Sequence, residues 1–179
     1  MNALQKQYSL LAKYNFSMNQ SMYQSCAALN VFELRKHRSA FFGSIINTLN
    51  HILVGDIIWL KRIANQELKL ESIQEINNFE TPNSLSQVLF DDFAILQQAR
   101  MYIDSVFIAL AEELTEQNLN SLMQYENTEG NIFKKRTSDV LLHVFNHQTH
   151  HRGQVSTLLS QIDIDYGSTD LIVLTDSFE

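Results

Sequence analysis

The sequence predicts an all-α protein, a four-helix bundle with a short hairpin or loop between its third and fourth helices. Of the 179 residues, 45% are hydrophobic, which is enough for one substantial core. Only five are glycine and one is proline, so the residues that punctuate sandwiches and barrels are scarce. Four segments carry apolar residues at helical spacing. We therefore expect one domain over residues 1–179.

The first two helices are expected at residues 3–28 and 39–64. In both segments apolar side chains recur at three- and four-residue intervals or their multiples, which places them on one side of a helix. The two stripes comprise Leu4, Tyr8, Leu11, Met18 and Met22, and then Ile45, Leu49, Ile52, Trp59 and Ile63. Such stripes are typical of a helix that faces a core.

The third and fourth helices are expected at residues 85–114 and 138–161. Pro82 stops the preceding segment and Ser84 is a candidate N-cap for the third helix. Before the fourth helix, Thr137, Ser138 and Asp139 are all good N-cap residues. Between these helices the chain turns polar, and Asn127, Glu129, Gly130 and Asn131 have the chemistry of a reversal. At the end of the chain, residues 171–174 are the part of the acidic tail that we expect to pack.

The charge of the chain argues against nucleic acid as a partner. The formal net charge is −7 at pH 7, whereas nucleic-acid binders draw much of their affinity from clustered Lys and Arg. Two short basic clusters occur at residues 35–38 and 134–136, and we interpret both as solvated loop ends.

Three features favour a cytoplasmic protein. The single cysteine, Cys26, cannot form an internal disulfide, and because no activating base lies near it in sequence we expect it to pack in the core. Residues 1–11 lack the basic start and apolar block of a signal peptide. No stretch reaches the ~20 apolar residues of a membrane span, so no membrane contact is expected.

Histidines are crowded in the expected fourth helix, which carries His143, His147, His150 and His151 within nine residues. Residues four apart stand one turn above each other, about 6 Å between Cβ atoms, which lets two imidazoles reach one metal ion. His143 and His151 are about 12 Å apart along the axis, so all of them cannot bind one ion. At roughly 100° per residue, His147 and His151 face the apolar side. We predict that this inward pair binds a divalent metal.

A stable site of the zinc type needs a third protein ligand, and His51 is the strongest candidate. It lies midway along the second expected helix beside small or polar neighbours that leave room around it, namely Ser44, Asn47, Thr48 and Gly55. His37 lies in a connection and is a weaker candidate. The alternative is that these histidines are surface residues, or core residues satisfied by hydrogen bonds.

Two segments resemble a known family. Residues 142–154 read LHVFNHQTHHRGQ and residues 49–60 read LNHILVGDIIWL, and both are similar to the histidine-bearing helices of the DinB/YfiT-like proteins. The resemblance extends over nearly the whole chain, including a closing segment at residues 169–171. It implies an up-down-down-up four-helix bundle, usually a homodimer, with nickel or zinc bound at the positions of His51, His147 and His151. Family members with known activity include thiol-dependent transferases and isomerases, in which the metal is taken to activate the sulfur of a small thiol cofactor.

Three neutral imidazoles leave the ion its double positive charge and at least one position for water or substrate. We therefore expect a metal-dependent enzyme with a small-molecule substrate, either a transferase that uses a low-molecular-weight thiol or a hydrolase that uses metal-bound water. The alternative is a non-catalytic, metal-binding stress-response protein whose metal is structural. The fourth coordination position distinguishes them, because an open position favours catalysis and a fourth protein ligand favours structure.

Four further residues are candidates for roles around the metal. Asn47 or Gln154 can orient a ligand imidazole. Arg152 can hold an anionic substrate near the end of the bundle, and His150 can carry protons if it reaches the pocket. Each is equally compatible with a solvated polar residue or a packing spacer.

Overall fold

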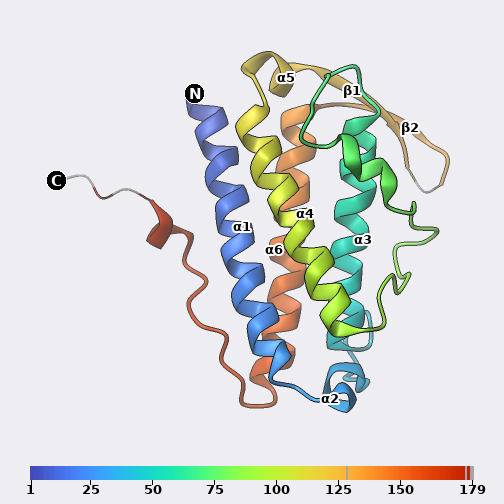
Figure 1. The fold of residues 1–179 in the computed structure, drawn as a ribbon, viewed down its shortest axis with the longest axis vertical. Helices are drawn as coiled ribbons and strands as arrows, with labels where there is room; N and C mark the ends of the chain where they lie inside the picture. Colours follow the sequence, from blue (N-terminus) through green and yellow to red (C-terminus); the bar gives the residue numbers. More distant parts are fainter. Residues whose placement is uncertain (128, 176, 178–179) are drawn as a thin grey trace.

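The computed structural model describes residues 1–127, 129–175 and 177, and the chain is mostly helical with one small sheet (Figure 1). The four long helices are α1 (Ala3–Ala27), α3 (Ile45–Ala64), α4 (Phe93–Glu113) and α6 (Thr137–Ser160). The shorter elements are α2 (Val31–Arg35), η1 (Gln74–Asn78), α5 (Glu116–Asn120), β1 (Leu122–Glu126), β2 (Ile132–Arg136) and η2 (Leu171–Leu174). The two strands correct the all-α expectation in the place where a hairpin or a loop was predicted.

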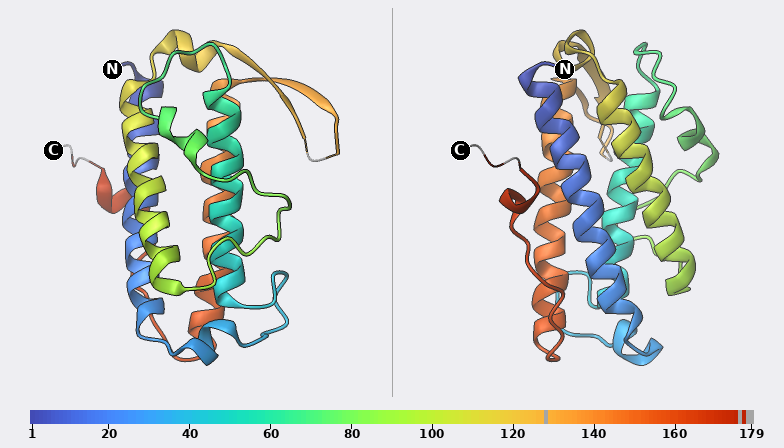
Figure 2. Two further views of the ribbon diagram at one scale, coloured as in Figure 1. Left: turned by 45° about the vertical axis from the view of Figure 1, so that its right-hand side comes forward. Right: turned by 60° about the vertical axis from the view of Figure 1, so that its left-hand side comes forward.

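The four long helices lie side by side (Figures 1 and 2). α1 packs against α4 and α6, and α3 packs against the same two helices. In Figure 1, α1 and α6 run downward, whereas α3 and α4 run upward. The two helices that carry the clustered histidines, α3 and α6, are therefore antiparallel neighbours.

The apolar stripes of the long helices meet between them and form the core. Fully buried members include Met22, Leu49, Leu53, Ile57, Ile103, Phe107, Leu110, Val155 and Leu159. Cys26 is also fully buried and burial raises the pKa of its thiol to about 12, so the prediction that it packs in the core is confirmed. Within the described residues, none of the helices combines the length and the hydropathy that crossing a membrane requires.

α3 begins six residues later than the start predicted at residue 39. Ser39 and Gly43 have φ angles of 55° and 81°, in the left-handed region that interrupts a helix. Ser44 then caps the helix, since its side chain accepts a hydrogen bond from the backbone N–H of Asn47. The apolar pattern alone did not reveal this irregular segment, which turns out to contribute to the site.

α4 begins at Phe93 rather than at residue 85, and its N-cap is Asp92 rather than Ser84. The buried side chain of Asn50 explains the difference. Its Oδ1 accepts hydrogen bonds from the backbone N–H groups of Leu89 and Phe90, at 2.9 and 3.0 Å, and its Nδ2 donates to the carbonyl of Phe90. These bonds hold residues 85–92 against α3 as a loop.

The hairpin of β1 and β2 leads directly into α6. The strands are antiparallel, and Tyr125 pairs with Phe133. The N-cap position of α6 is Arg136, which makes no side-chain capping bond, so the expectation of a cap at residues 137–139 was wrong. Instead, the backbone N–H of Thr137 donates to the carbonyl of Ser121 at 3.0 Å, which joins the helix to the hairpin.

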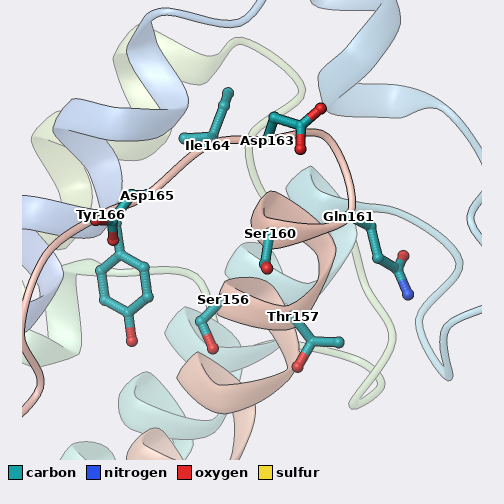
Figure 3. A pocket seen from close by; sticks show the side chains of 8 residues that line it. All are labelled: Ser156, Thr157, Ser160, Gln161, Asp163, Ile164, Asp165 and Tyr166. Atoms are coloured by element: carbon teal, nitrogen blue, oxygen red, sulfur yellow. The ribbon is translucent and has the colours of Figure 1, made fainter.

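After α6 the chain turns back along the helices. The loop and the last turns of α6 enclose an open pocket of about 790 Å³ (Figure 3). Hydroxyl and carboxylate groups dominate its lining, which consists of Ser156, Thr157, Ser160, Gln161, Asp163, Ile164, Asp165 and Tyr166, and none of the six histidines takes part. The tail is held to α1 by Tyr14, whose hydroxyl donates to the carbonyl of Thr169 at 2.6 Å. η2 contacts α1 but has no buried residue, so residues 171–174 pack only at the surface of the helices.

Candidate metal centre

The imidazoles of His51, His147 and His151 converge between α3 and α6. The Nε2 atom of His51 lies 3.1 Å from Nε2 of His147 and 3.1 Å from Nε2 of His151. One ring nitrogen from each residue lies within 4.8 Å of the other two. The structure thus brings together the three predicted ligands, which are separated by up to 100 residues in sequence.

The antiparallel pairing of α3 with α6 explains how the three rings meet. His51 faces His151, and one turn along, Gly55 faces His147. A Cβ atom built on Gly55 would lie 2.9 Å from Cε1 of His147, closer than a Cβ atom approaches a non-bonded carbon. The predicted role of Gly55 therefore needs correction, because the space it leaves is filled by His147 rather than by His51.

Two of the imidazoles are oriented by hydrogen bonds through their other ring nitrogen. Nδ1 of His51 lies 2.7 Å from the carbonyl oxygen of Leu85, and Nδ1 of His151 lies 2.8 Å from Oε1 of Gln154. Both partners are oxygens that only accept, so each Nδ1 carries the hydrogen and each Nε2 of a neutral ring presents a lone pair.

The geometry of these lone pairs tests whether a cation fits. Nε2 of His51 and Nε2 of His151 are both acceptors and face each other at 3.1 Å, an arrangement that is repulsive without a positive charge between them. A tetrahedral ion with metal–nitrogen distances of about 2.0–2.1 Å separates its ligand atoms by roughly 3.3–3.4 Å. The donor set therefore fits a transition metal ion, and imidazole is a ligand that such ions favour.

Burial keeps the three rings neutral. It lowers the pKa of His147 to about 3, and the neighbouring histidines add to the effect. Burial also lowers the pKa of His51 and of His151, although the hydrogen bonds to Leu85 and Gln154 oppose the shift. Because a metal needs unprotonated imidazole, the site is ready to bind a cation at neutral pH without first losing protons.

One side of the histidine cluster is covered by Phe42, which the sequence did not single out. Its ring stacks on that of His51 with centroids 3.9 Å apart and planes 21° apart, and it meets His151 edge-on at 5.5 Å. Phe42 lies in the irregular segment before α3, where no periodic pattern marks the direction of a side chain. It presents an apolar wall to the space among the three nitrogens.

The remaining potential ligands lie outside the cluster. Among the residues that the structure describes, no carboxylate or thiolate joins the three histidines. His37 packs against Gly43 and its Nδ1 accepts a hydrogen bond from the backbone of Ser39. His143 instead packs edge-on against Trp59, with centroids 5.2 Å apart.

The structure separates the two candidates for orienting a ligand ring. Gln154 contacts His151 through Oε1, and its Nε2 lies 3.3 Å from Nε2 of the exposed His150. Asn47 does not orient His51, whose Nδ1 bonds to Leu85 instead. The spacing of three residues between His151 and Gln154 on one helix was the signal for this contact, whereas a backbone carbonyl from a loop gives no such signal.

Arg152 does not hold a substrate at the end of the bundle, because its side chain is buried between the helices. It is 4% exposed, and its guanidinium donates to Oδ1 of Asn15 and, at 3.1 Å, to Oγ1 of Thr149. On α1, Asn15 and Asn19 in turn donate to the carboxylate of Asp104 at 2.9–3.0 Å.

Two buried ion pairs of Arg100 complete this polar network beside the histidines. Arg100 of α4 forms ion pairs with Asp56 of α3 and Asp104 of α4, and all three side chains are at most 1% exposed. Gln148, which follows His147 directly in sequence, donates to Asp56 at 2.8 Å. All four long helices contribute to the network, so it fixes the relative positions of the helices that carry the ligands. The network leaves little trace in the sequence, because single polar residues inside apolar stripes are a weak signal.

Comparison with known proteins agrees with the two histidine motifs. The family model described as DinB family matches residues 1–176. The chain belongs to the DinB family. This confirms the resemblance that residues 49–60 and 142–154 indicate.

Two DinB relatives match over most of their length. The chain is 24% identical over 160 residues to the protein DinB of Bacillus subtilis (strain 168), covering 89% of this chain and 88% of that protein. A crystal structure of a DinB-like protein from Bacillus cereus ATCC 10987 superposes with a TM-score of 0.56 at 21% identity, covering 84% of this chain and 89% of that one. At this identity the second match shows a shared fold.

Proposed function

We propose that His51, His147 and His151 bind one divalent transition metal ion, zinc or nickel. The observation that carries this proposal is the pair of Nε2 lone pairs of His51 and His151, which face each other at 3.1 Å. The orienting bonds to Leu85 and Gln154 support it, since metal-binding histidines usually donate their other N–H to a carbonyl or carboxylate.

We further propose that the metal serves an enzyme acting on a small molecule. When bound, a divalent ion with an open coordination position supplies a Lewis acid that polarises a carbonyl or lowers the pKa of a water or thiol. The absence of a fourth protein ligand among the described residues supports catalysis over a purely structural metal. Phe42 excludes water from one side of the cluster, and the bonds to Leu85 and Gln154 hold two rings in a fixed tautomer.

Two reaction classes remain for this proposal, transfer to or from a low-molecular-weight thiol and hydrolysis. The chain offers no reactive thiol of its own, because Cys26 is fully buried and its pKa is raised. A thiol reaction would therefore need a free small thiol as cofactor or substrate. His150, exposed and linked to His151 through Gln154, is the candidate proton carrier of either reaction.

The arrangement of α1, α3, α4 and α6 supports the proposal that the chain is one DinB-type four-helix bundle domain. We also propose that the chain forms a homodimer, as the family resemblance implies. Sedimentation velocity of the untagged protein tests it, and a species with the mass of one 20.7 kDa chain at micromolar concentration would contradict it.

Metal content measured with a matched pair of variants tests the proposed site. We expect about one zinc or nickel per chain in untagged protein, loss of that metal in His147→Gln, and retention in His143→Gln, which changes the same residue type one turn away. Full occupancy in His147→Gln would remove His147 from the site.

The reaction class is tested with the metal-loaded protein and its His147→Gln variant. Electrophilic substrates are supplied with and without a small thiol such as cysteine, and ester substrates are supplied alone. Turnover that requires both thiol and His147 supports the transferase, whereas ester cleavage that requires His147 supports the hydrolase. A metal that resists chelation, raises the melting temperature and supports neither reaction would favour a structural role.

A further inference from the structure

A pocket lies between α3, α6 and the hairpin, one helical turn beyond His147. Where α3 and α6 pack against each other, His51 faces His151, Gly55 faces His147, and Trp59 faces His143. The rings of His143 and His147 have centroids 6.0 Å apart. At the level of Trp59 and His143, side chains of α3, α6 and the hairpin line a pocket of about 240 Å³, namely Trp59, Tyr125, Lys135, Asp139, Val140 and His143.

Three aromatic rings form the walls of this pocket. Tyr125 meets Trp59 at 72° with centroids 4.9 Å apart, and His143 meets Trp59 at 68° with centroids 5.2 Å apart. The side chain of Tyr125 is supported from behind by Phe133, which stacks on it across the hairpin. Perpendicular rings that are fixed in this way offer both faces and edges to a flat guest.

The hairpin is pinned in place over α3, so the pocket is preformed. Arg62 donates to the carbonyl of Glu126 at 2.8 Å, and Gln66 exchanges two hydrogen bonds with the backbone of Gln124, at 3.1 and 3.2 Å. A preformed pocket binds without the cost of ordering a loop.

The charged residues around the pocket determine which charge a ligand can carry. The faces of aromatic rings such as Trp59 and Tyr125 can bind a cation. Here the guanidinium of Arg62 already takes that place, because it lies 4.6 Å from the centre of the Trp59 ring and 5.0 Å from the centre of the Tyr125 ring. Lys135 adds a second positive charge at the lining, against one carboxylate, that of Asp139. This balance disfavours a cationic guest and favours a neutral or anionic one.

The volume of the pocket indicates that it holds one part of a molecule. Sites that enclose a whole drug-sized ligand measure roughly 300–1,000 Å³, and this pocket measures about 240 Å³. We expect a single ring to fit, with the rest of the molecule extending towards His147, whose ring centroid lies 6.0 Å from that of His143.

We propose that this pocket, which we call the ring pocket, binds an aromatic group without positive charge and holds the part of the substrate remote from the metal. The link to the metal rests on the proposed function, whereas binding of the aromatic group to the ring pocket does not. The proposed metal site of this chain therefore acts on molecules that carry an uncharged or anionic aromatic ring.

Intrinsic fluorescence tests the ring pocket directly, since Trp59 is the only tryptophan of the chain. The metal-free protein is titrated in EDTA with phenylacetate, with cyclohexylacetate, which has the same charge but no aromatic ring, and with phenethylamine, which has the ring with a positive charge. We expect saturable quenching by phenylacetate, with affinity about tenfold weaker for each of the other two. Equal affinity for cyclohexylacetate, or tighter binding of phenethylamine, would overturn the proposal.

Variants place this binding in the ring pocket. Tyr125→Leu and, on the other wall, His143→Leu should each weaken phenylacetate about tenfold, whereas Phe32→Leu, on the exposed helix α2 at the opposite end of the molecule (Figure 1), should not. Tyr125 lies in the hairpin and His143 lies in α6. If Tyr125→Leu does not fold, His143→Leu still tests the assignment. Unchanged affinity in His143→Leu would contradict the assignment.

The link to the metal is tested separately on zinc-loaded protein of measured metal content. Acetohydroxamate is compared with benzohydroxamate, phenylacetohydroxamate and 3-phenylpropionohydroxamate, in which the chelating group and the ring are progressively further apart. We expect at least one aromatic hydroxamate to bind about tenfold more tightly than acetohydroxamate, with the gain lost in His143→Leu. If none of the aromatic hydroxamates binds more tightly than acetohydroxamate to protein that binds phenylacetate, the ring pocket stands. The proposal that one substrate occupies both the ring pocket and the metal site would then be overturned. Absence of zinc would instead contradict the proposed metal site.

Discussion

Gly55 of α3 lies directly opposite His147 of α6, so closely that a Cβ atom at position 55 would stand 2.9 Å from Cε1 of the imidazole. A glycine in the middle of a helix costs about 1 kcal/mol relative to alanine. The contact with His147 gives a reason for keeping it, because only a residue without a side chain leaves the ring in place. Helix stability and ligand geometry therefore make opposite demands on this position.

The Gly55→Ala variant separates these demands. We expect the metal-free variant to be as stable as the wild type or more stable by up to about 1 kcal/mol, since the atom displaced is the far end of a side chain and alanine favours the helix. Zinc affinity should fall at least about tenfold because His147 is displaced. Urea unfolding in EDTA and competition with a zinc chelator measure the two effects. Unchanged zinc affinity would show that His147 does not need its present position.

The hydrogen bond from His151 to Gln154 should control metal affinity. Gln154→Leu removes the acceptor that holds Nδ1 of His151 in its protonated form, and loss of such a partner costs about 10- to 100-fold in affinity. Gln154→Glu keeps an acceptor and should restore most of the affinity. His150→Gln is the control, because it changes the other partner of Gln154 and leaves the acceptor of His151 in place. Equal losses in all three variants would contradict the orienting role.

The stability of the metal-free protein should fall in mild acid. The pKa of His147 is lowered from 6.5 to about 3 in the folded chain, so below pH 6.5 the unfolded chain takes up a proton that the folded chain does not. Stability rises with pH wherever the unfolded state binds more protons. The contribution of His147 to stability is therefore fully present above pH 6.5 and is lost as the pH falls towards 3. One such group contributes at most about 1.4 kcal/mol per pH unit. Urea unfolding in EDTA at pH 7.5, 6.5 and 5.5 gives the free energy of unfolding as a function of pH. This free energy should change less with pH in His147→Gln than in the wild type, and an identical pH dependence would refute the role of His147.

The buried network should be sensitive to the loss of any charged member. Asp56→Ala leaves Arg100 without one of its two carboxylates and Gln148 without its acceptor. Breaking a buried ion pair in this way costs about 3–5 kcal/mol. Glu112→Ala, which removes an exposed carboxylate on α4, should change the free energy of unfolding by less than about 0.5 kcal/mol. Similar stability of the two variants by urea unfolding would show that the network is dispensable.

The regular parts of the fold followed from the sequence, and the loops did not. Helical spacing predicted α1 and α6 to within one residue at either end, because long amphipathic segments pack against a core. The starts of α3 and α4 were placed too early, since the deciding interactions are a left-handed backbone at Gly43 and the side chain of Asn50 bonding to a distant loop. Neither leaves a periodic signal.

The candidate site divides in the same way. His147 and His151 were predicted as one inward pair from their spacing on a single helix, and Gln154 was one of two candidates, with Asn47, for orienting a ligand ring. Phe42 and the carbonyl of Leu85 were missed because both come from irregular segments. Arg152 was a candidate for holding an anionic substrate near the end of the bundle, but its side chain lies in the core within a polar network that spans several helices.

The metal site itself is tested most directly by X-ray absorption spectroscopy of the untagged protein loaded with one equivalent of zinc. Three imidazole nitrogens at about 2.0–2.1 Å and one oxygen ligand from solvent are expected, with the imidazole signal reduced in His147→Gln and unchanged in His143→Gln. A spectrum that shows fewer than three imidazoles, or one that His147→Gln leaves unaltered, would contradict the convergence of His51, His147 and His151 on one ion.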